Sequence, residues 1–99
     1  MDFKAHLVRQ MAFSHATYGP GRRTKGVADH LRKEIKEVRE SEGSPDEWVD
    51  IAILALDGLT RSLAYMEGDE IEKRLDPKWV AETAIMMIEQ KQSKNEKRH

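Results

Sequence analysis

Hydrophobic residues recur at the three- and four-residue spacing of an α-helix along most of the chain. This pattern predicts helices over residues 2–12, 27–42, 45–66 and 77 to the carboxyl terminus, with a short helix at 69–75. Residues 14–26 (SHATYGPGRRTKG) interrupt the pattern with glycine and proline, which predicts a long loop of the kind that carries function in a small domain. The predicted fold class is all-α, a helical bundle.

The predicted helix at 27–42 has an apolar stripe with a carboxylate at its edge. The stripe consists of Val27, Leu31, Ile35 and Val38. At roughly 100° per residue, Glu34 lies about 20° from Val27. An ionised carboxylate so close to a core needs a partner, which favours a functional role for Glu34 over a place on a solvated charged face.

The predicted helix at 45–66 is apolar nearly all round, which is typical of a helix at the centre of a bundle. Its polar residues Glu47, Asp50, Asp57 and Arg61 are confined to a sector roughly 80° wide. This line of residues is either the solvent side of the helix or a functional face.

Two acidic pairs with i, i+3 spacing occur on these consecutive helices, Glu34 with Glu37 and Glu47 with Asp50. Residues three apart lie on the same side of a helix, so each pair presents its oxygens in one direction. If the two helices fold face to face, four carboxylates form a site suited to Mg²⁺ or Mn²⁺. A solvated charged face is the competing interpretation.

Capping signals mark two helix starts. Ser44 and Pro45 suit the N-cap and first helical positions, and Ser44 with Glu47 forms a capping-box pattern that is a rival explanation for Glu47. Asp76 and Pro77 give the same type of signal for the last helix.

The apolar stripe of the last helix becomes cationic towards the carboxyl terminus. The stripe of Val80, Ala84, Met87 and Ile88 continues in the same phase into Lys91, Asn95 and Arg98, with Lys94 slightly off the line. Basic side chains aimed at an acidic, metal-binding face can hold phosphate groups, whereas a frayed, solvated tail would account for the same charges.

Composition limits the class of protein. The 99 residues contain 38% hydrophobic residues, enough for one domain (1–99) whose small core would gain from self-association. The net charge of -1 argues against general nucleic-acid binding, and the absence of cysteine excludes disulfides and thiolate metal sites. Without a run of eighteen apolar residues or a signal peptide, a cytoplasmic protein that does not enter membranes is expected.

Four strings together resemble a known family. Glu34-x-x-Glu37 followed by Glu47-x-x-Asp50 resembles the signature of the all-α MazG-like nucleoside triphosphate pyrophosphohydrolases. The phage and bacterial dATP/dGTP diphosphohydrolases, the MazZ-like branch, are more similar, through FSHATYGPGRRTKG, HLRKEIKEV, EWVDIAILALDG and KQSKNEKR. Lys33 stands where many MazG-like enzymes have a further Glu, and the spacer before Glu47 is short; both features look typical of the MazZ-like branch.

The resemblance implies a reaction and a set of roles. A deoxypurine triphosphate, dATP or dGTP, would be cut between its α- and β-phosphates to the monophosphate and pyrophosphate, with Mg²⁺ or Mn²⁺ as cofactor. Two or more ions would be held by Glu34, Glu37, Glu47 and Asp50, and Glu37 or Glu34 would accept the proton of the attacking water. The phosphate-binding residues would be Lys91, Lys94, Asn95 and Arg98, and those that select base and sugar Phe13, Thr17 and Tyr18.

Two other classes of function compete with the enzyme. One is a non-catalytic helical module in which the acidic and basic stripes mediate self-association or bind a host protein. The other is a nucleic-acid binder that uses the basic residues of the 14–26 loop and of the tail, against which the net charge argues. In the enzyme interpretation, a second copy is expected to complete the bundle, as a homodimer or a dimer of dimers, with an active site shared between chains.

Overall fold

The structure is a computed structural model and describes residues 1–66 and 76–98. Within these ranges the chain forms the helices α1 (Phe3–Tyr18), α2 (Thr24–Ser41), α3 (Pro45–Ala64) and α5 (Pro77–Arg98), and no strand. The all-α prediction is confirmed. The short helix expected at 69–75 lies outside the described residues.

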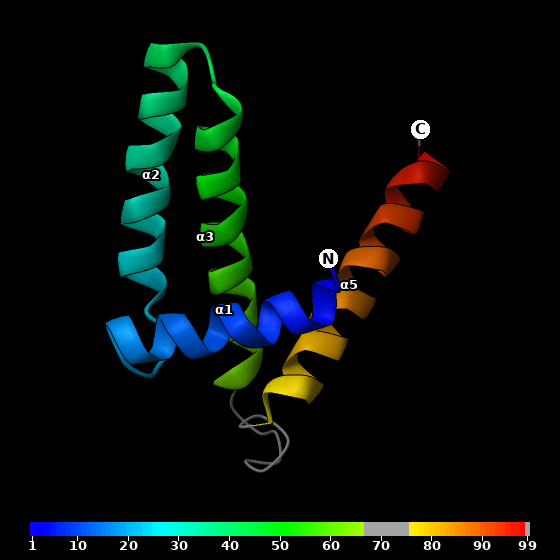
Figure 1. The fold of residues 1–99 in the computed structure, drawn as a ribbon. Helices are drawn as coiled ribbons and strands as arrows, with labels where there is room; N and C mark the ends of the chain where they lie inside the picture. Colours follow the sequence, from blue (N-terminus) through cyan, green and yellow to red (C-terminus); the bar gives the residue numbers. More distant parts are fainter. Residues whose placement is uncertain (67–75, 99) are drawn as a thin grey trace.

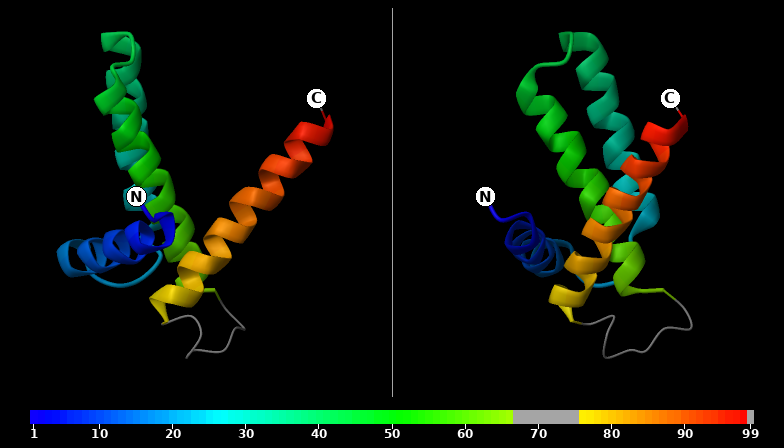
Figure 2. Two further views of the ribbon diagram at one scale, coloured as in Figure 1. Left: turned by 45° about the vertical axis from the view of Figure 1, so that its right-hand side comes forward. Right: turned by 90° about the vertical axis from the view of Figure 1, so that its right-hand side faces the viewer.

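Helices α2 and α3 form an antiparallel hairpin, and α1 crosses it near the end at which α2 begins and α3 finishes (Figure 1). Helix α5 starts beside that same end of α3 and then runs away from the hairpin (Figure 2). The hydrophobic core lies where α1, α3 and α5 meet and consists of Leu7, Met11, Leu63, Ala64, Val80, Ala81 and Ala84. Alanine at positions 81 and 84, both fully buried, allows α5 to approach its neighbours closely.

The loop predicted at 14–26 is much shorter in the structure, where it spans residues 19–23. Helix α1 continues to Tyr18 and ends at Gly19, whose φ of 84° is one that other residues rarely adopt and whose N–H donates to the His15 carbonyl at 2.9 Å. Gly26 lies inside the first turn of α2 instead of in a loop. The candidate residues Phe13, Thr17 and Tyr18 therefore belong to a helix.

Residues 42–44 make the tight turn between α2 and α3. Glu42 and Gly43 both have positive φ, 65° and 75°. A side chain on Gly43 would place its Cβ 2.8 Å from Nε1 of Trp48, so the indole fills the space beside this glycine. The turn accepts only glycine here because of both its backbone conformation and its packing.

The predicted starts of α3 and α5 are at the right residues, but one capping prediction is wrong. Ser44 is the N-cap of α3 and Pro45 its first residue, yet the Ser44 side chain makes no capping hydrogen bond. The Glu47 carboxylate accepts a hydrogen bond from the Ser41 hydroxyl instead, so there is no capping box. At α5 the Asp76 carboxylate accepts from the Lys78 N–H at 3.0 Å, as expected of an N-cap before Pro77.

Several apolar residues expected in the core are exposed in the single chain. On α3, Trp48 and Val49 are 55% and 54% exposed, so only the carboxyl-terminal half of this helix is central. On α5, Val80 and Ala84 are buried as predicted, but Met87 and Ile88 are 42% and 38% exposed. These residues lie on segments that diverge from each other in both views of Figure 2. No helix among the described residues is long and apolar enough to cross a membrane.

Candidate functional site

A cavity of ≈ 240 Å³ lies between α1, α2 and α3 and has both an aromatic and an acidic side; we call it the mixed cavity. It is lined by Gln10, Phe13, Ser14, Tyr18, His30, Glu34, Asp50, Ile53, Leu54 and Asp57. Carboxylates beside an apolar surface are what a ligand with a flat ring and a charged group would require.

Glu34 is the electrostatic centre of the acidic side. Its side chain is only 12% exposed. Burial raises the pKa of the Glu34 carboxyl, and the neighbouring charges of Glu37 and Asp50, with a hydrogen bond to Glu37, raise it further. His30 acts in the opposite direction, with Nε2 3.4 Å from Glu34 Oε1. The fold therefore brings three of the four predicted carboxylates, from two helices, into electrostatic contact.

The fourth carboxylate, Glu47, lies at the turn and accepts the hydrogen bond from Ser41. In the ranges that the structure describes, no three acidic or imidazole groups are arranged to hold a metal ion, so ligation requires rotation of the side chains. The donor chemistry nevertheless fits a divalent cation, because Glu34 is largely buried among like charges that a cation would neutralise.

Helix α1 brings the aromatic candidates to the same cavity. Phe13 and Tyr18 are 67% and 52% exposed, and both line the cavity. The Arg23 guanidinium lies over the Tyr18 ring at 4.8 Å from its centroid, which restrains the ring from one face. Thr17 is exposed and is not among the lining residues, so the structure brings two of the three predicted base-contacting residues to the cavity.

Two further lining residues, Gln10 and Ser14, were not predicted from the sequence, whereas Asp57 belongs to the predicted polar line of α3. Gln10 donates from Nε2 to the Ile53 carbonyl at 2.8 Å and thereby ties α1 to α3. Ser14 and Asp57 are buried and joined by a hydrogen bond of 2.7 Å. Asp57 also forms an ion pair with Arg61 at 3.1 Å. The i, i+4 spacing of these two residues is a sequence signal for that pair.

The predicted phosphate-binding residues lie elsewhere. Lys91, Lys94, Asn95 and Arg98 are exposed on the last turns of α5, the part that leads away from the α2–α3 hairpin (Figures 1 and 2). Within one chain, the structure does not bring them to the carboxylates.

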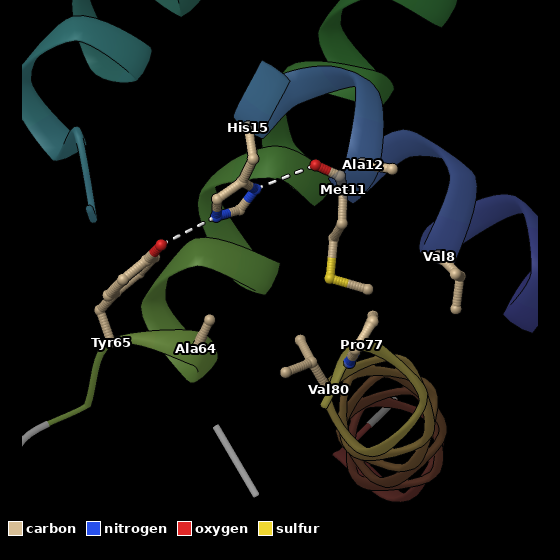
Figure 3. Close-up of a pocket in the computed structure, with 8 residues that line it drawn as sticks. All are labelled: Val8, Met11, Ala12, His15, Ala64, Tyr65, Pro77 and Val80. Atoms are coloured by element: carbon tan, nitrogen blue, oxygen red, sulfur yellow. Dashed lines mark hydrogen bonds between the residues drawn. The ribbon is translucent and has the colours of Figure 1, made fainter. Parts of the chain in front are cut away.

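A second cavity, of ≈ 210 Å³, has a different character. Its lining residues in the described part of the chain are Val8, Met11, Ala12, His15, Ala64, Tyr65, Pro77 and Val80, none of them acidic. Its polar edge is a pair of hydrogen bonds made by His15: Nδ1 donates to the Met11 carbonyl at 2.9 Å, and Nε2 and the Tyr65 hydroxyl share a hydrogen bond at 3.1 Å (Figure 3). This cavity lacks the charge that the predicted chemistry needs, so the mixed cavity is the candidate site.

Comparison with known proteins agrees with the sequence pattern. Residues 7–99 match the model of a protein family described as dATP/dGTP pyrophosphohydrolase. No curated protein and no solved structure matches the chain.

Proposed function

The chain belongs to the dATP/dGTP pyrophosphohydrolase family, and on that basis we propose that it hydrolyses dATP or dGTP between the α- and β-phosphates. Water adds across this anhydride bond, the bridging oxygen leaves with pyrophosphate, and the deoxynucleoside monophosphate is the second product. The observation that best supports the proposal is the meeting of Glu34 with Glu37 and Asp50. Glu34 and Asp50 line a cavity that Phe13 and Tyr18 line as well.

We propose Glu34, Glu37, Glu47 and Asp50 as the ligands of two or more Mg²⁺ or Mn²⁺ ions. When bound, such ions neutralise triphosphate charge and acidify the attacking water. Glu34 or Glu37 then accepts the proton of that water, a role supported by the position of Glu34 at the cavity and of Glu37 beside it.

The size of the mixed cavity suggests which part of the substrate it holds. Pockets that enclose whole small ligands measure about 300–1,000 Å³, and this one measures ≈ 240 Å³. We therefore place the deoxynucleoside inside, with the base against Phe13 and Tyr18, and the triphosphate outside along the carboxylates. Stacking of a base on an aromatic ring contributes about 1–3 kcal/mol. Thr17 is exposed and does not line the cavity, so we propose that it contacts the substrate only at the mouth of the cavity.

The β- and γ-phosphates need cations that one chain does not supply at the cavity. We propose that Lys91, Lys94, Asn95 and Arg98 come from a second copy, in a homodimer or a dimer of dimers. The exposed apolar residues on the first half of α3 and in the middle of α5 support this arrangement, because association would cover both.

The direct test is to incubate the purified protein with each of the four deoxynucleoside triphosphates, with and without Mg²⁺ or Mn²⁺, and to separate the products chromatographically. We expect metal-dependent formation of dAMP or dGMP together with pyrophosphate. Formation of a diphosphate and orthophosphate would contradict the proposed bond. A folded Glu37→Gln variant should be inactive, and turnover near the parent level would remove Glu37 from the mechanism.

A non-catalytic interaction module is the second candidate, favoured by the exposed Trp48 and Val49. Absence of turnover with every nucleotide and metal would support it. In that case the acidic and basic faces would serve association alone.

A further inference from the structure

A buried polar network adjoins the mixed cavity and joins the carboxyl-terminal end of α1 to α3. It consists of Ser14 on α1, Asp57 and Arg61 on α3, and the carbonyls of Gly19 and Gly21; we call it the Arg61 network. The exposed fractions of Ser14, Asp57 and Arg61 are 5%, 7% and 0%. Ser14 and Asp57 line the cavity, whereas Arg61 does not.

Every donor of the Arg61 guanidinium is used within the protein. Nε donates to both Asp57 carboxylate oxygens at 3.1 and 3.2 Å. Nη1 donates to the carbonyls of Gly19 and Gly21 at 3.0 and 2.8 Å, and Nη2 to the carbonyl and hydroxyl of Ser14 at 3.2 and 2.8 Å. Arg61 therefore has no donor left for a phosphate, and it does not contact the substrate.

The network also closes the carboxyl-terminal end of α1. Helix ends leave carbonyls without intrahelical partners, and a cation there interacts favourably with the helix dipole. Gly19 and Gly21 both have positive φ, 84° and 98°, and both carbonyls reach the same guanidinium nitrogen. The last turn of α1, which carries Tyr18, is thus held against α3 by one side chain.

Stability alone is a weak reason for such an arrangement. A buried ion pair is often no more stabilising than apolar residues of the same volume, because both charges must be desolvated. What a fully bonded guanidinium supplies is a fixed relative position of the elements it joins. Here those elements are the two walls of the cavity, with Phe13 and Tyr18 on α1 and Leu54 on α3.

We propose that Arg61 is a positioning residue for the nucleoside: it sets the separation between the aromatic wall on α1 and the α3 wall, and through it the selection of the base. This inference rests on the proposed function. The proposed metal ligands lie on α2 and α3 and take no part in these hydrogen bonds. The network therefore governs binding and selection of the base and leaves the hydrolytic groups in place.

Arg61→Lys tests the proposal. Lysine keeps the charge, but its three donors on one nitrogen cannot serve Asp57, Ser14 and two glycine carbonyls together. We expect the KM for the preferred deoxypurine triphosphate to rise by up to roughly a hundredfold, the order of loss that a misplacement of about 1 Å can cause. We expect kcat to change by less than about threefold and the preference over dCTP and dTTP, as a ratio of kcat/KM, to fall with the rise in KM.

Val80→Ala is the control for general loosening of the fold. Val80 is 1% exposed in the α1–α3–α5 core and does not line the mixed cavity. We expect this variant to lose thermal stability and to keep the parent KM and base preference. If Arg61→Lys does not fold, Ser14→Ala removes a single hydroxyl from the network, and a smaller rise in KM with the same loss of preference is expected.

The outcomes separate the two proposals. A folded Arg61→Lys with parent KM and base preference overturns the role of Arg61 while the enzyme assignment stands. An equal rise in KM in Val80→Ala also overturns it, since any destabilisation would then have the same effect. Failure of the parent protein to release pyrophosphate from any deoxynucleotide refutes the proposed function, and the positioning role with it, before a variant is made.

Discussion

At Glu34, burial and neighbouring negative charge both act against ionisation of the carboxyl. Its carboxyl is largely shielded from water, shares a hydrogen bond with Glu37 and faces Asp50. Both conditions make the ionised form unfavourable, and His30 offsets them only in part. A divalent cation among these oxygens would turn mutual repulsion into attraction, so metal binding and the stability of the fold should be linked.

The first prediction concerns this linkage. Mn²⁺ should raise the thermal unfolding midpoint of the parent. At a Mn²⁺ concentration a hundredfold above its Kd, the gain in unfolding free energy should be about 2.7 kcal/mol. Glu34→Gln should be more stable than the parent without metal, because it removes a buried like charge, and should respond much less to Mn²⁺. Differential scanning calorimetry with and without Mn²⁺ measures both.

Glu40→Gln is the matched control, since Glu40 lies on the same helix but is 66% exposed and paired with Lys36. It should keep the full response to Mn²⁺. An equal response in Glu34→Gln and the parent would exclude Glu34 as a metal ligand.

At the scale of the elements, the helices begin in different ways. The Asp2 carboxylate caps α1 by accepting from the N–H groups of Lys4 and Ala5 at 3.0 and 3.4 Å. The Ser44 hydroxyl makes no such bond at α3. Two residues of the N-cap type therefore contribute differently to their helices.

The second prediction follows from that difference. Asp2→Ala should cost about 1 kcal/mol of unfolding free energy, the usual loss for an N-cap that is bonded. Ser44→Ala should lower the unfolding free energy by no more than a few tenths of a kcal/mol, because no capping hydrogen bond is lost. Urea denaturation at one fixed protein concentration compares the two, and a larger loss for Ser44→Ala would show that its hydroxyl does cap α3.

Local sequence signals predicted most of this fold. Helical periodicity located all the helices of the described ranges, and proline marked the first residues of α3 and α5 correctly. The α1–α2 boundary was misread because glycine and proline composition did not distinguish Gly19 and Gly21, which have positive φ, from Gly26, which is helical. Only the backbone conformation separates these positions.

The parts of the candidate site that depend on short sequence spacings were predictable, and those that depend on distant residues were not. The acidic pairs follow from spacing on two adjoining helices, and the structure brings Glu34, Glu37 and Asp50 together. The burial of Arg61 was not predictable, because its partners on α1 and the following turn lie about forty residues away and are mostly backbone carbonyls. Every residue has a backbone carbonyl, so the type of residue does not indicate which carbonyls accept a hydrogen bond from Arg61.

At the scale of the whole molecule, the described part of the single chain leaves large apolar side chains uncovered. Its core occupies the junction of α1, α3 and α5, while the far end of the hairpin and the middle of α5 expose large apolar side chains. A helix that extends beyond its packing partners gains little stability by itself. A second copy that covers both regions would extend the core and bring basic residues towards the carboxylates.

The third prediction is that the protein is at least dimeric by light scattering coupled to size exclusion. Val49→Glu, at a 54% exposed position outside the mixed cavity, should shift the mass towards the monomer and reduce turnover at low protein concentration. Ala28→Glu introduces the same side chain at an exposed position on α2 and should change neither property. A monomeric parent with full turnover would contradict the shared site.

The length of the turn at Gly43 is tied to the acidic pair on α3 and to the packing of Trp48. A residue inserted here and absorbed into α3 would rotate Glu47 and Asp50 by about 100° relative to α2. One absorbed into the turn would have to move Trp48 out of the space beside Gly43. A longer spacer would therefore have to restore both the direction of the acidic pair on α3 and the packing of Trp48.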